Sequence, residues 1–276
     1  MTLDLPIADR TLAELLPETL TYSLCIHIDK GTEVWVVAGM LVQYLESATD
    51  SVMVRDEDHN PIGTIGGKEI MENLLKNPSS SLFFGTMVED IMEPNPVLVT
   101  KDTKYKDLMK HWKERGRAYA VIANEWGFYS AISSKKILEI GMRCKTNISI
   151  RDLPKKIPIT FKKDDTIGAI IKSMFENKTR KVLLENSNKY LNDRIIIETI
   201  TEKMKYLKEI EDFLNMPASV IGLEEARVIF DDLTINEVSA MMYDMEHPYV
   251  IYKDWIVTPW DVCNVLLDKE ITKYTA

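Results

Sequence analysis

The sequence predicts an α/β protein built from four copies of one β-α-β-β-α unit, each about 60 residues long. Three observations lead to this prediction. A polar helix start containing Thr recurs four times, an apolar stripe at helical spacing follows each start, and two short apolar strands follow each stripe. Because a single copy would leave a sheet face and its helix stripes uncovered, we expect the copies to pack together.

Each unit opens with a short β-like run and a capped helix. A Thr at the helix start can accept a hydrogen bond from an early helical N–H, and a nearby Asp favours the positive helix end. Thr234 also has Glu237 three residues later and so completes a capping box. The plainest opening runs are residues 97–99, 157–161 and 228–230, and the predicted helix-capping residues are Thr32, Thr103, Thr166 and Thr234.

Two strands and a second helix complete each unit. Turns rich in Asp, Asn, Gly or Pro separate the two strands. The first strands are predicted at residues 51–54, 118–122, 181–184 and 249–252, and the second at 62–65, 128–132, 195–198 and 255–257. The closing helices are predicted at 67–75, 134–140, 200–208 and 259–267, which gives four repeats at residues 10–77, 84–145, 148–210 and 218–270. A helix-prone segment, residues 203–214, is expected to join the last two repeats or to form a dimer surface.

Composition excludes several classes of protein. The formal net charge of −9 over 276 residues argues against a nucleic-acid partner, which needs a basic surface. The apolar runs fall short of the ~20 residues that span a bilayer, and the N-terminus lacks a cationic, apolar signal segment, so we expect a cytoplasmic protein. The three cysteines are widely spaced and predict neither a metal site nor a disulfide framework.

The C-terminal strand and helix start form the most distinctive candidate site. Thr258 and Asp261 put a hydroxyl and a carboxylate at a helix N-terminus, where free N–H groups can hold phosphate. Thr-Pro-x-Asp is also an ordinary helix start, with Thr as the N-cap and Pro at the first helical position. The residues alone therefore leave both interpretations open.

The repeat resembles the CBS domain, named after cystathionine β-synthase. Residues 88–100 (VEDIMEPNPVLVT) are similar to the entry motif of that family, and residues 255–261 are similar to its "G-h-h-T/S-x-x-D-h" signature. The resemblance implies two CBS pairs (Bateman modules), at about residues 10–145 and 148–270, each with pseudo-two-fold symmetry. Four repeats without a catalytic domain resemble stand-alone archaeal CBS proteins and the γ subunit of AMP-activated protein kinase.

The resemblance also implies a ligand site in repeat four. It assigns phosphate contact to Thr258 and ribose contact to Asp261, while Trp255 replaces the signature Gly and narrows the cleft. The implied contacts to the base come from the opening strand and the middle strand: Val228, Ile229 and Tyr249.

The other repeats depart from the signature. Repeat two keeps a hydroxyl, Ser133, but has Lys136 at the ribose position, and repeat one keeps an acid, Glu69, but loses the hydroxyl. Repeat three lacks the Asp on either plausible register, so at most one of the four sites is complete. Three basic residues, Lys156, Arg117 and Arg180, are placed either to contact phosphates in the clefts or to be solvated at the surface, and solvation is the favoured role for each.

These expectations favour a non-catalytic regulatory protein that binds AMP, ADP, ATP or S-adenosylmethionine between paired repeats. The ligand would shift the orientation of the repeats, and an unidentified regulated protein, or a second copy in a homodimer, would respond. No cofactor is required, and the sequence contains no constellation typical of an enzyme. The alternative is a structural or protein-interaction module in which Trp255, Trp260 and Tyr249 fill ligand-free clefts.

Overall fold

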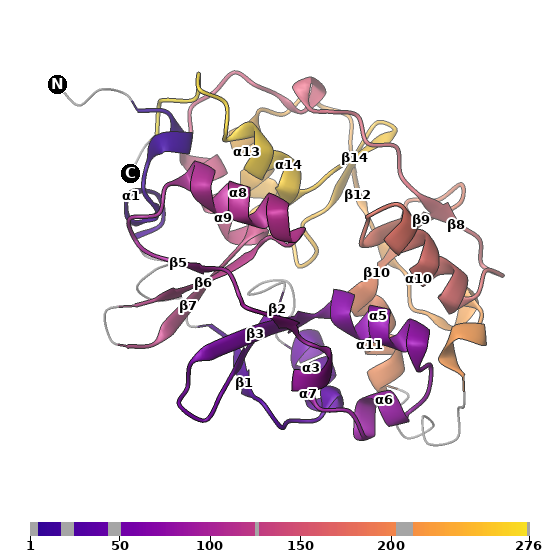
Figure 1. Ribbon diagram of the computed structural model, residues 1–276. Helices are drawn as coiled ribbons and strands as arrows, with labels where there is room; N and C mark the ends of the chain where they lie inside the picture. Colours follow the sequence, from indigo (N-terminus) through magenta and orange to yellow (C-terminus); the bar gives the residue numbers. More distant parts are fainter. Residues whose placement is uncertain (1–4, 18–24, 44–50, 125–126, 203–211, 275–276) are drawn as a thin grey trace.

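The computed structural model describes residues 5–17, 25–43, 51–124, 127–202 and 212–274. Within these residues the strands form four small sheets, and each sheet belongs to one repeat (Figure 1). In every sheet the opening strand runs parallel to the middle strand, and the middle strand pairs antiparallel with the last. This confirms the predicted β-α-β-β-α repeat and the α/β fold class.

The first two repeats occupy the N-terminal half of the chain. Repeat one contains β1 (His27–Asp29), α3 (Val34–Gln43), β2 (Ser51–Arg55), β3 (Pro61–Gly66) and α5 (Gly67–Lys76). Short helices α6 (Ser81–Phe84) and α7 (Val88–Ile91) then lead to β4 (Glu93–Pro94). Repeat two contains β5 (Leu98–Val99), α8 (Tyr105–Arg115), β6 (Tyr119–Ala123), β7 (Tyr129–Ser133) and α9 (Ser134–Arg143).

The last two repeats follow the same order. Repeat three contains β8 (Thr160–Phe161), α10 (Ile167–Glu176), β9 (Lys181–Leu184), β10 (Lys189–Asn192) and α11 (Asp193–Glu202). Repeat four follows β11 (Glu224–Glu225) and contains β12 (Arg227–Ile229), α13 (Ile235–Tyr243), β13 (Val250–Tyr252), β14 (Trp255–Val257) and α14 (Pro259–Val265). The N-terminal α1 (Leu12–Leu15) packs in the core of repeats two and four.

Backbone pairing shows which repeats form pairs. The last strand of each repeat is extended by the segment that leads into another repeat, so its edge N–H and C=O groups are satisfied. Strand β4 pairs with β3, and β11 pairs with β10. The segments that precede β1 and β8 pair in the same way with the last strands of repeats two and four. The Cys25 N–H donates to the Tyr129 carbonyl at 2.8 Å, and the Ile256 N–H donates to the Lys156 carbonyl at 3.0 Å. Repeats one and two therefore form one pair, and repeats three and four form the other.

Helices join the two pairs to each other. Helix α11 packs against α3 and α5 of repeat one, and α9 of repeat two packs against α13 and α14. One apolar core accordingly holds mainly residues of repeats one and three, together with Tyr249, Ile251 and Ile256 of repeat four. A second core holds residues of repeats two and four. A small residue is required where α9 meets α13, because a Cβ on Gly141 would collide with the Ser239 hydroxyl. Sheets thus hold each pair together, and helices hold the pairs to one another.

Repeat three corrects one prediction. Residues 195–198 were predicted as its second strand, but they lie inside α11, and the strand is β10 at Lys189–Asn192. Three consecutive β-branched residues, Ile195 to Ile197, are all buried in the helix, so burial by neighbouring helices overrides their strand propensity. The helix begins where the Asn192 Oδ1 accepts a hydrogen bond from the Ile195 N–H at 2.8 Å.

Two of the four predicted helix caps are confirmed. Thr166 accepts a hydrogen bond from the Ala169 N–H, and the Thr234 N–H donates to the Glu237 carboxylate at 2.8 Å. Thr103 and Thr32 are not caps, because the helices that follow begin at Tyr105 and Val34. The predicted helix end at 203–208 and most of the joining segment, at 203–211, lie outside the described residues.

No helix in the described part of the chain is long and apolar enough to cross a membrane.

Candidate functional site: a basic cavity at the junction of four repeats

A cavity of about 810 Å³ lies where all four repeats meet. Its walls include the first residues of α5, α9, α11 and α14, together with the loops that precede β6 and β9. The volume falls in the range of about 300–1,000 Å³ that is typical of small-molecule sites. The cavity therefore belongs to both pairs rather than to the cleft of one repeat.

The cavity wall is basic although the whole chain is acidic. The chain has 43 Asp and Glu against 34 Lys and Arg. Among the described residues that line the cavity, Asp193 alone is acidic. The eight basic lining residues are Lys68, Lys113, Arg117, Lys135, Lys156, Lys178, Arg180 and Lys181. Such a concentration of one sign of charge in a concave site attracts anions.

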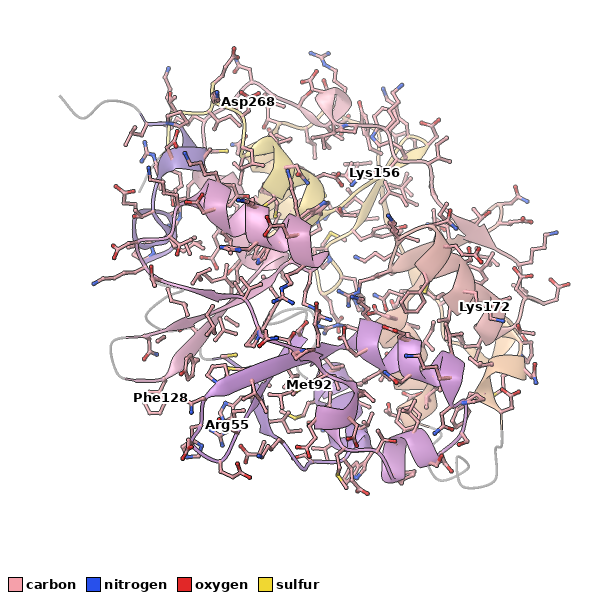
Figure 2. All side chains as sticks on the ribbon, viewed as in Figure 1. Arg55, Met92, Phe128, Lys156, Lys172 and Asp268 are labelled. Carbon is pink, nitrogen blue, oxygen red and sulfur yellow. The ribbon has the colours of Figure 1, made fainter. Side chains whose placement is uncertain are left out.

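The predicted corner in repeat four is formed, and its carboxylate is already occupied. Asp261 is 4% exposed, and one of its oxygens accepts from the Thr258 N–H at 2.9 Å and the Thr258 hydroxyl at 2.8 Å. The other oxygen lies 2.5 Å from the Lys156 ammonium, whose side chain is 44% exposed. Lys156 comes from the segment that leads into repeat three (Figure 2). The acid therefore serves as a helix cap and as half of an ion pair between repeats.

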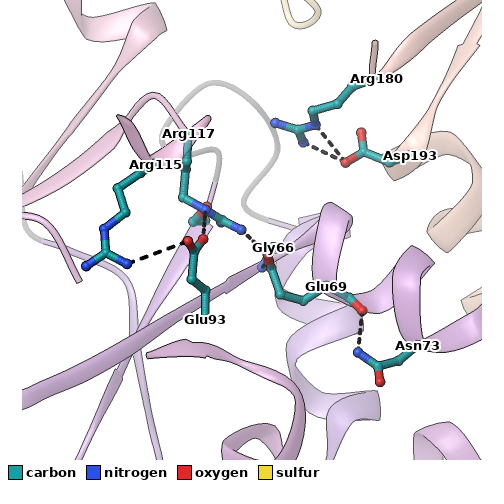
Figure 3. A network of polar contacts seen from close by, with 9 residues as sticks. Gly66, Glu69, Asn73, Glu93, Arg115, Arg117, Arg180 and Asp193 are labelled. Carbon is teal, nitrogen blue, oxygen red and sulfur yellow. Dashed lines mark hydrogen bonds and ion pairs between the residues drawn. The ribbon is translucent and has the colours of Figure 1, made fainter. Parts of the chain in front are cut away.

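A similar ion pair occurs at the start of α5. The Glu69 carboxylate accepts from the Gly66 N–H at 2.9 Å and forms an ion pair with Arg117 of repeat two. Arg117 also donates to Glu93 at 3.1 Å (Figure 3). It donates to the Ser51 hydroxyl as well. Its side chain is 10% exposed, so this corner is closed by a guanidinium with three partners.

Arg180 occupies the matching position in repeat three, before the middle strand. Its Nε and Nη2 donate to the Asp193 carboxylate at 2.8 and 2.7 Å, at the first position of α11 (Figure 3). In the same wall, the Lys181 ammonium lies 4.7 Å from the centre of the Tyr249 ring. A cation–π contact of this kind holds the ammonium group beside the cavity.

Three polar atoms at the wall lack partners among the described residues. They are the Ser133 hydroxyl, the Tyr249 hydroxyl and the Trp112 indole N–H, and all three side chains are almost fully buried. Burial raises the pKa of Tyr249 well above its ordinary value, so the phenol stays protonated and can donate. Unpaired buried donors beside a cavity are unfavourable alone and favour a polar occupant.

The structure brings together only part of the predicted site. Thr258, Tyr249, Lys156 and Ser133 line the cavity, whereas Asp261 and Glu69 lie behind its wall in their ion pairs. Three predicted residues are placed elsewhere: Lys136 pairs with Glu139 at 3.4 Å, and Val228 and Ile229 lie in β12, outside the described lining.

Trp255, predicted to narrow the repeat-four cleft, is buried away from the cavity. Its ring packs edge-on against Tyr252, with the centroids 4.9 Å apart, and the Lys155 ammonium lies 4.7 Å from its centroid. Sequence reasoning missed the cavity residues Lys68, Lys113 and Lys178. No sequence motif marks them, because they meet only when helices from different repeats pack.

Four β-α-β-β-α repeats, paired through their sheets, define the fold of the CBS-domain proteins, as the sequence predicted. Comparison with solved structures agrees. The chain is similar to a Methanocaldococcus jannaschii protein described as a candidate archaeal homologue of g-AMPK, with a TM-score of 0.72 and 12% identity. That match covers 91% of this chain and 99% of the other.

A second match is an uncharacterised conserved protein from Pyrococcus horikoshii, with a TM-score of 0.51 and 14% identity over 90% of this chain and 98% of the other. A CBS-domain-containing protein from Agrobacterium tumefaciens matches 48% of this chain and 92% of its own length, with a TM-score of 0.40 and 16% identity. No protein-family model and no curated protein sequence matches the chain. At these identities the first two matches, with TM-scores of 0.72 and 0.51, support the fold and nothing beyond it.

Proposed function

We propose that the protein is a non-catalytic regulatory protein that binds an adenine nucleotide or an adenosyl compound at the central cavity. The observation that carries the proposal is the basic wall at the junction of four repeats. The first residues of α5, α9 and α11, each a helix of ten residues, line this wall, and their N–H groups and dipoles favour anions.

The cavity also offers surface for a base. Trp112 and Trp260 lie in its wall with ring centroids 6.4 Å apart, and Tyr249 lies in the same wall. Trp260 is the partly exposed ring of the three, and an aromatic face of this kind can stack with any base. The similar M. jannaschii protein is described as a candidate homologue of g-AMPK, which supports a regulatory role for the same fold.

The proposed signal is a shift in the relative orientation of the two pairs. A ligand in the cavity contacts residues of all four repeats, so its binding energy differs between open and closed arrangements of the pairs. A partner protein that distinguishes these arrangements would respond to the concentration of the ligand.

Calorimetric titration tests the proposal. The protein is first denatured in a parallel sample and analysed by chromatography to show that no ligand was co-purified. AMP, ADP, ATP and S-adenosylmethionine are then titrated separately, with GTP as a control for the base. Saturable heat with at least one adenine compound is expected, and no heat with any of the four would overturn the proposal.

A second function is supported by the ion pairs at Asp261 and Glu69. Both acids are used inside the protein, as expected of a structural module with ligand-free clefts. The double variant Thr258→Ala, Asp261→Ala separates the two functions. If nucleotide raises the melting temperature of the wild type more than that of the variant, the Thr258–Asp261 corner takes part in binding. If nucleotide changes neither melting temperature, the structural function is favoured.

A further inference from the structure

We infer that the cavity recognises a chain of phosphates and not the ribose of its ligand. The inference rests on the proposed function, because it specifies which part of a nucleotide the same cavity holds. Its chemical class is a linear oligophosphate, either free or as the tail of a nucleoside triphosphate.

The first argument comes from the four equivalent positions three residues after the helix N-caps. Two of the positions carry no acid: repeat two has Lys136 and repeat three has Ile195. The other two, Glu69 and Asp261, are 5% and 4% exposed and lie in ion pairs with Arg117 and Lys156. A ribose diol must reach a carboxylate directly, and these two carboxylates are buried behind the cations with which they pair.

The second argument comes from the cations that face the cavity. Lys68, Lys113 and Lys178 line it, and within the described residues none of them has a hydrogen-bond or ion-pair partner. They belong to three repeats and to both pairs: Lys68 to α5, Lys113 to α8, and Lys178 to the loop after α10. Cations on different walls match an extended anion better than a single phosphate.

The third argument compares the charges around the cavity. Arg117, Lys156 and Arg180 are each paired with acids, whereas Lys68, Lys113 and Lys178 have no ion-pair partner among the described residues. Triphosphate, with about four negative charges near neutral pH, can balance all three of these lysines. A monophosphate, with at most about two negative charges, would leave part of this positive charge unbalanced.

Competition calorimetry tests the inference with inorganic triphosphate, ATP, AMP and adenosine as probes. We expect triphosphate to bind with a Kd within about threefold of that of ATP and to displace it, whereas AMP binds about tenfold more weakly. Adenosine is expected neither to bind nor to compete. Raising the salt concentration should weaken triphosphate and ATP together.

The outcomes separate this inference from the proposed function. If ATP binds but triphosphate does not, or if adenosine displaces ATP, the inference is overturned and the proposed function stands. If triphosphate binds and none of AMP, ADP, ATP and S-adenosylmethionine binds, the inference stands and the proposed function is overturned. If AMP or S-adenosylmethionine binds while triphosphate and ATP do not, only the inference is overturned. If none of these compounds binds, both are overturned.

Variants locate the site. In the triple variant Lys68→Gln, Lys113→Gln, Lys178→Gln, the affinity for triphosphate should fall at least about tenfold, because three cations are lost from the wall. The matched control is Lys145→Gln, Lys172→Gln, Lys189→Gln, which changes three exposed lysines outside the cavity lining and should leave binding unchanged. Equal losses in both variants would show a general charge effect and overturn the inference.

Asp261→Asn gives a result of opposite sign for the two modes of recognition. Removing the carboxylate releases the half-exposed Lys156 ammonium, so phosphate recognition predicts tighter binding of both triphosphate and ATP. Ribose recognition predicts weaker ATP binding with triphosphate unchanged, and that result would overturn the inference. A melting curve of the variant shows that it is folded before binding is measured.

Discussion

The two pairs of repeats neutralise a buried acid with different basic residues. In each pair, an acid in the first turn of a closing helix is neutralised by a basic residue from the paired repeat. In the first pair, Arg117 bridges Glu69 and Glu93 and is 10% exposed. In the second pair, the Lys156 side chain is 44% exposed, and among the described residues its ion-pair partner is Asp261. Because Arg forms a rigid fork and Lys is a flexible point charge, the first corner is structural and the second can rearrange.

The largest expected effect is on the first pair. Arg117→Met removes the counterion of two carboxylates and should lower the free energy of unfolding by about 3–5 kcal/mol. Lys156→Met is the matched change in the second pair and should cost about 1 kcal/mol, since solvent screens the half-exposed ammonium. Urea denaturation of both variants measures the difference. Equal losses would show that the two corners are energetically equivalent.

The second-largest expected loss of stability is at the contact between the two pairs of repeats. Gly67, at the start of α5, faces the Asp193 carboxylate of repeat three, and an added Cβ would collide with that carboxylate. Gly67→Ala should therefore cost about 1–3 kcal/mol through displacement of Asp193 from Arg180. Gly39→Ala, inside α3 with open space around the added Cβ, is the control and should stabilise the helix slightly. Thermal melts compare the two, and a stable Gly67→Ala protein would contradict this contact.

Alkaline pH should weaken the sheet interface of the first pair. The Cys25 thiol is hydrogen-bonded to the Tyr119 hydroxyl at 3.0 Å, and burial raises its pKa to about 11. The folded state therefore holds the proton more tightly than the unfolded state. The stabilisation is complete below about pH 9 and declines as the pH rises toward 11, with about 1 kcal/mol lost at pH 10.

Cys25→Ala should flatten this pH dependence by that amount. Urea titrations at pH 8 and pH 10 measure this change in the pH dependence of stability. Cys144→Ala is the comparison: burial also raises the pKa of the Cys144 thiol to about 11, but this residue lies outside the sheet interface. An unchanged slope in Cys25→Ala would show that its thiol ionises no differently in the folded protein.

The smallest expected losses of stability come from two hydroxyl groups, the helix cap Thr258 and the candidate ligand group Ser133. Thr258→Ala loses the hydroxyl that bonds Asp261 and should cost about 1 kcal/mol. Ser133→Ala removes a hydroxyl without a protein partner among the described residues, so its stability should change by less than about 0.5 kcal/mol. If the Ser133 hydroxyl contacts ligand, the same variant weakens nucleotide binding in the calorimeter. A large loss of stability in Ser133→Ala would show an internal role instead.

Much of the repeat could be predicted from local patterns. The apolar stripe from Ile235 to Met242 and the capping box at Thr234 produced a helix where it was expected. The strand prediction failed at Ile195–Ile197, where β-branched residues lie in a helix whose faces are covered by other helices. Local propensity cannot register such burial, because the covering helix α3 is more than 150 residues away in the sequence.

By itself, the sequence determined the four units, their order and the Thr258–Asp261 corner, because hydrophobic period, turn residues and helix caps act over a few neighbouring positions. Only the tertiary structure decided that Asp261 faces Lys156, that Glu69 faces Arg117, and that basic residues of four repeats share one cavity. These relations depend on how sheets pair within a repeat pair and how helices pack between pairs. Electrostatic energy depends on distance in space, and the sequence does not specify that distance for residues in different repeats.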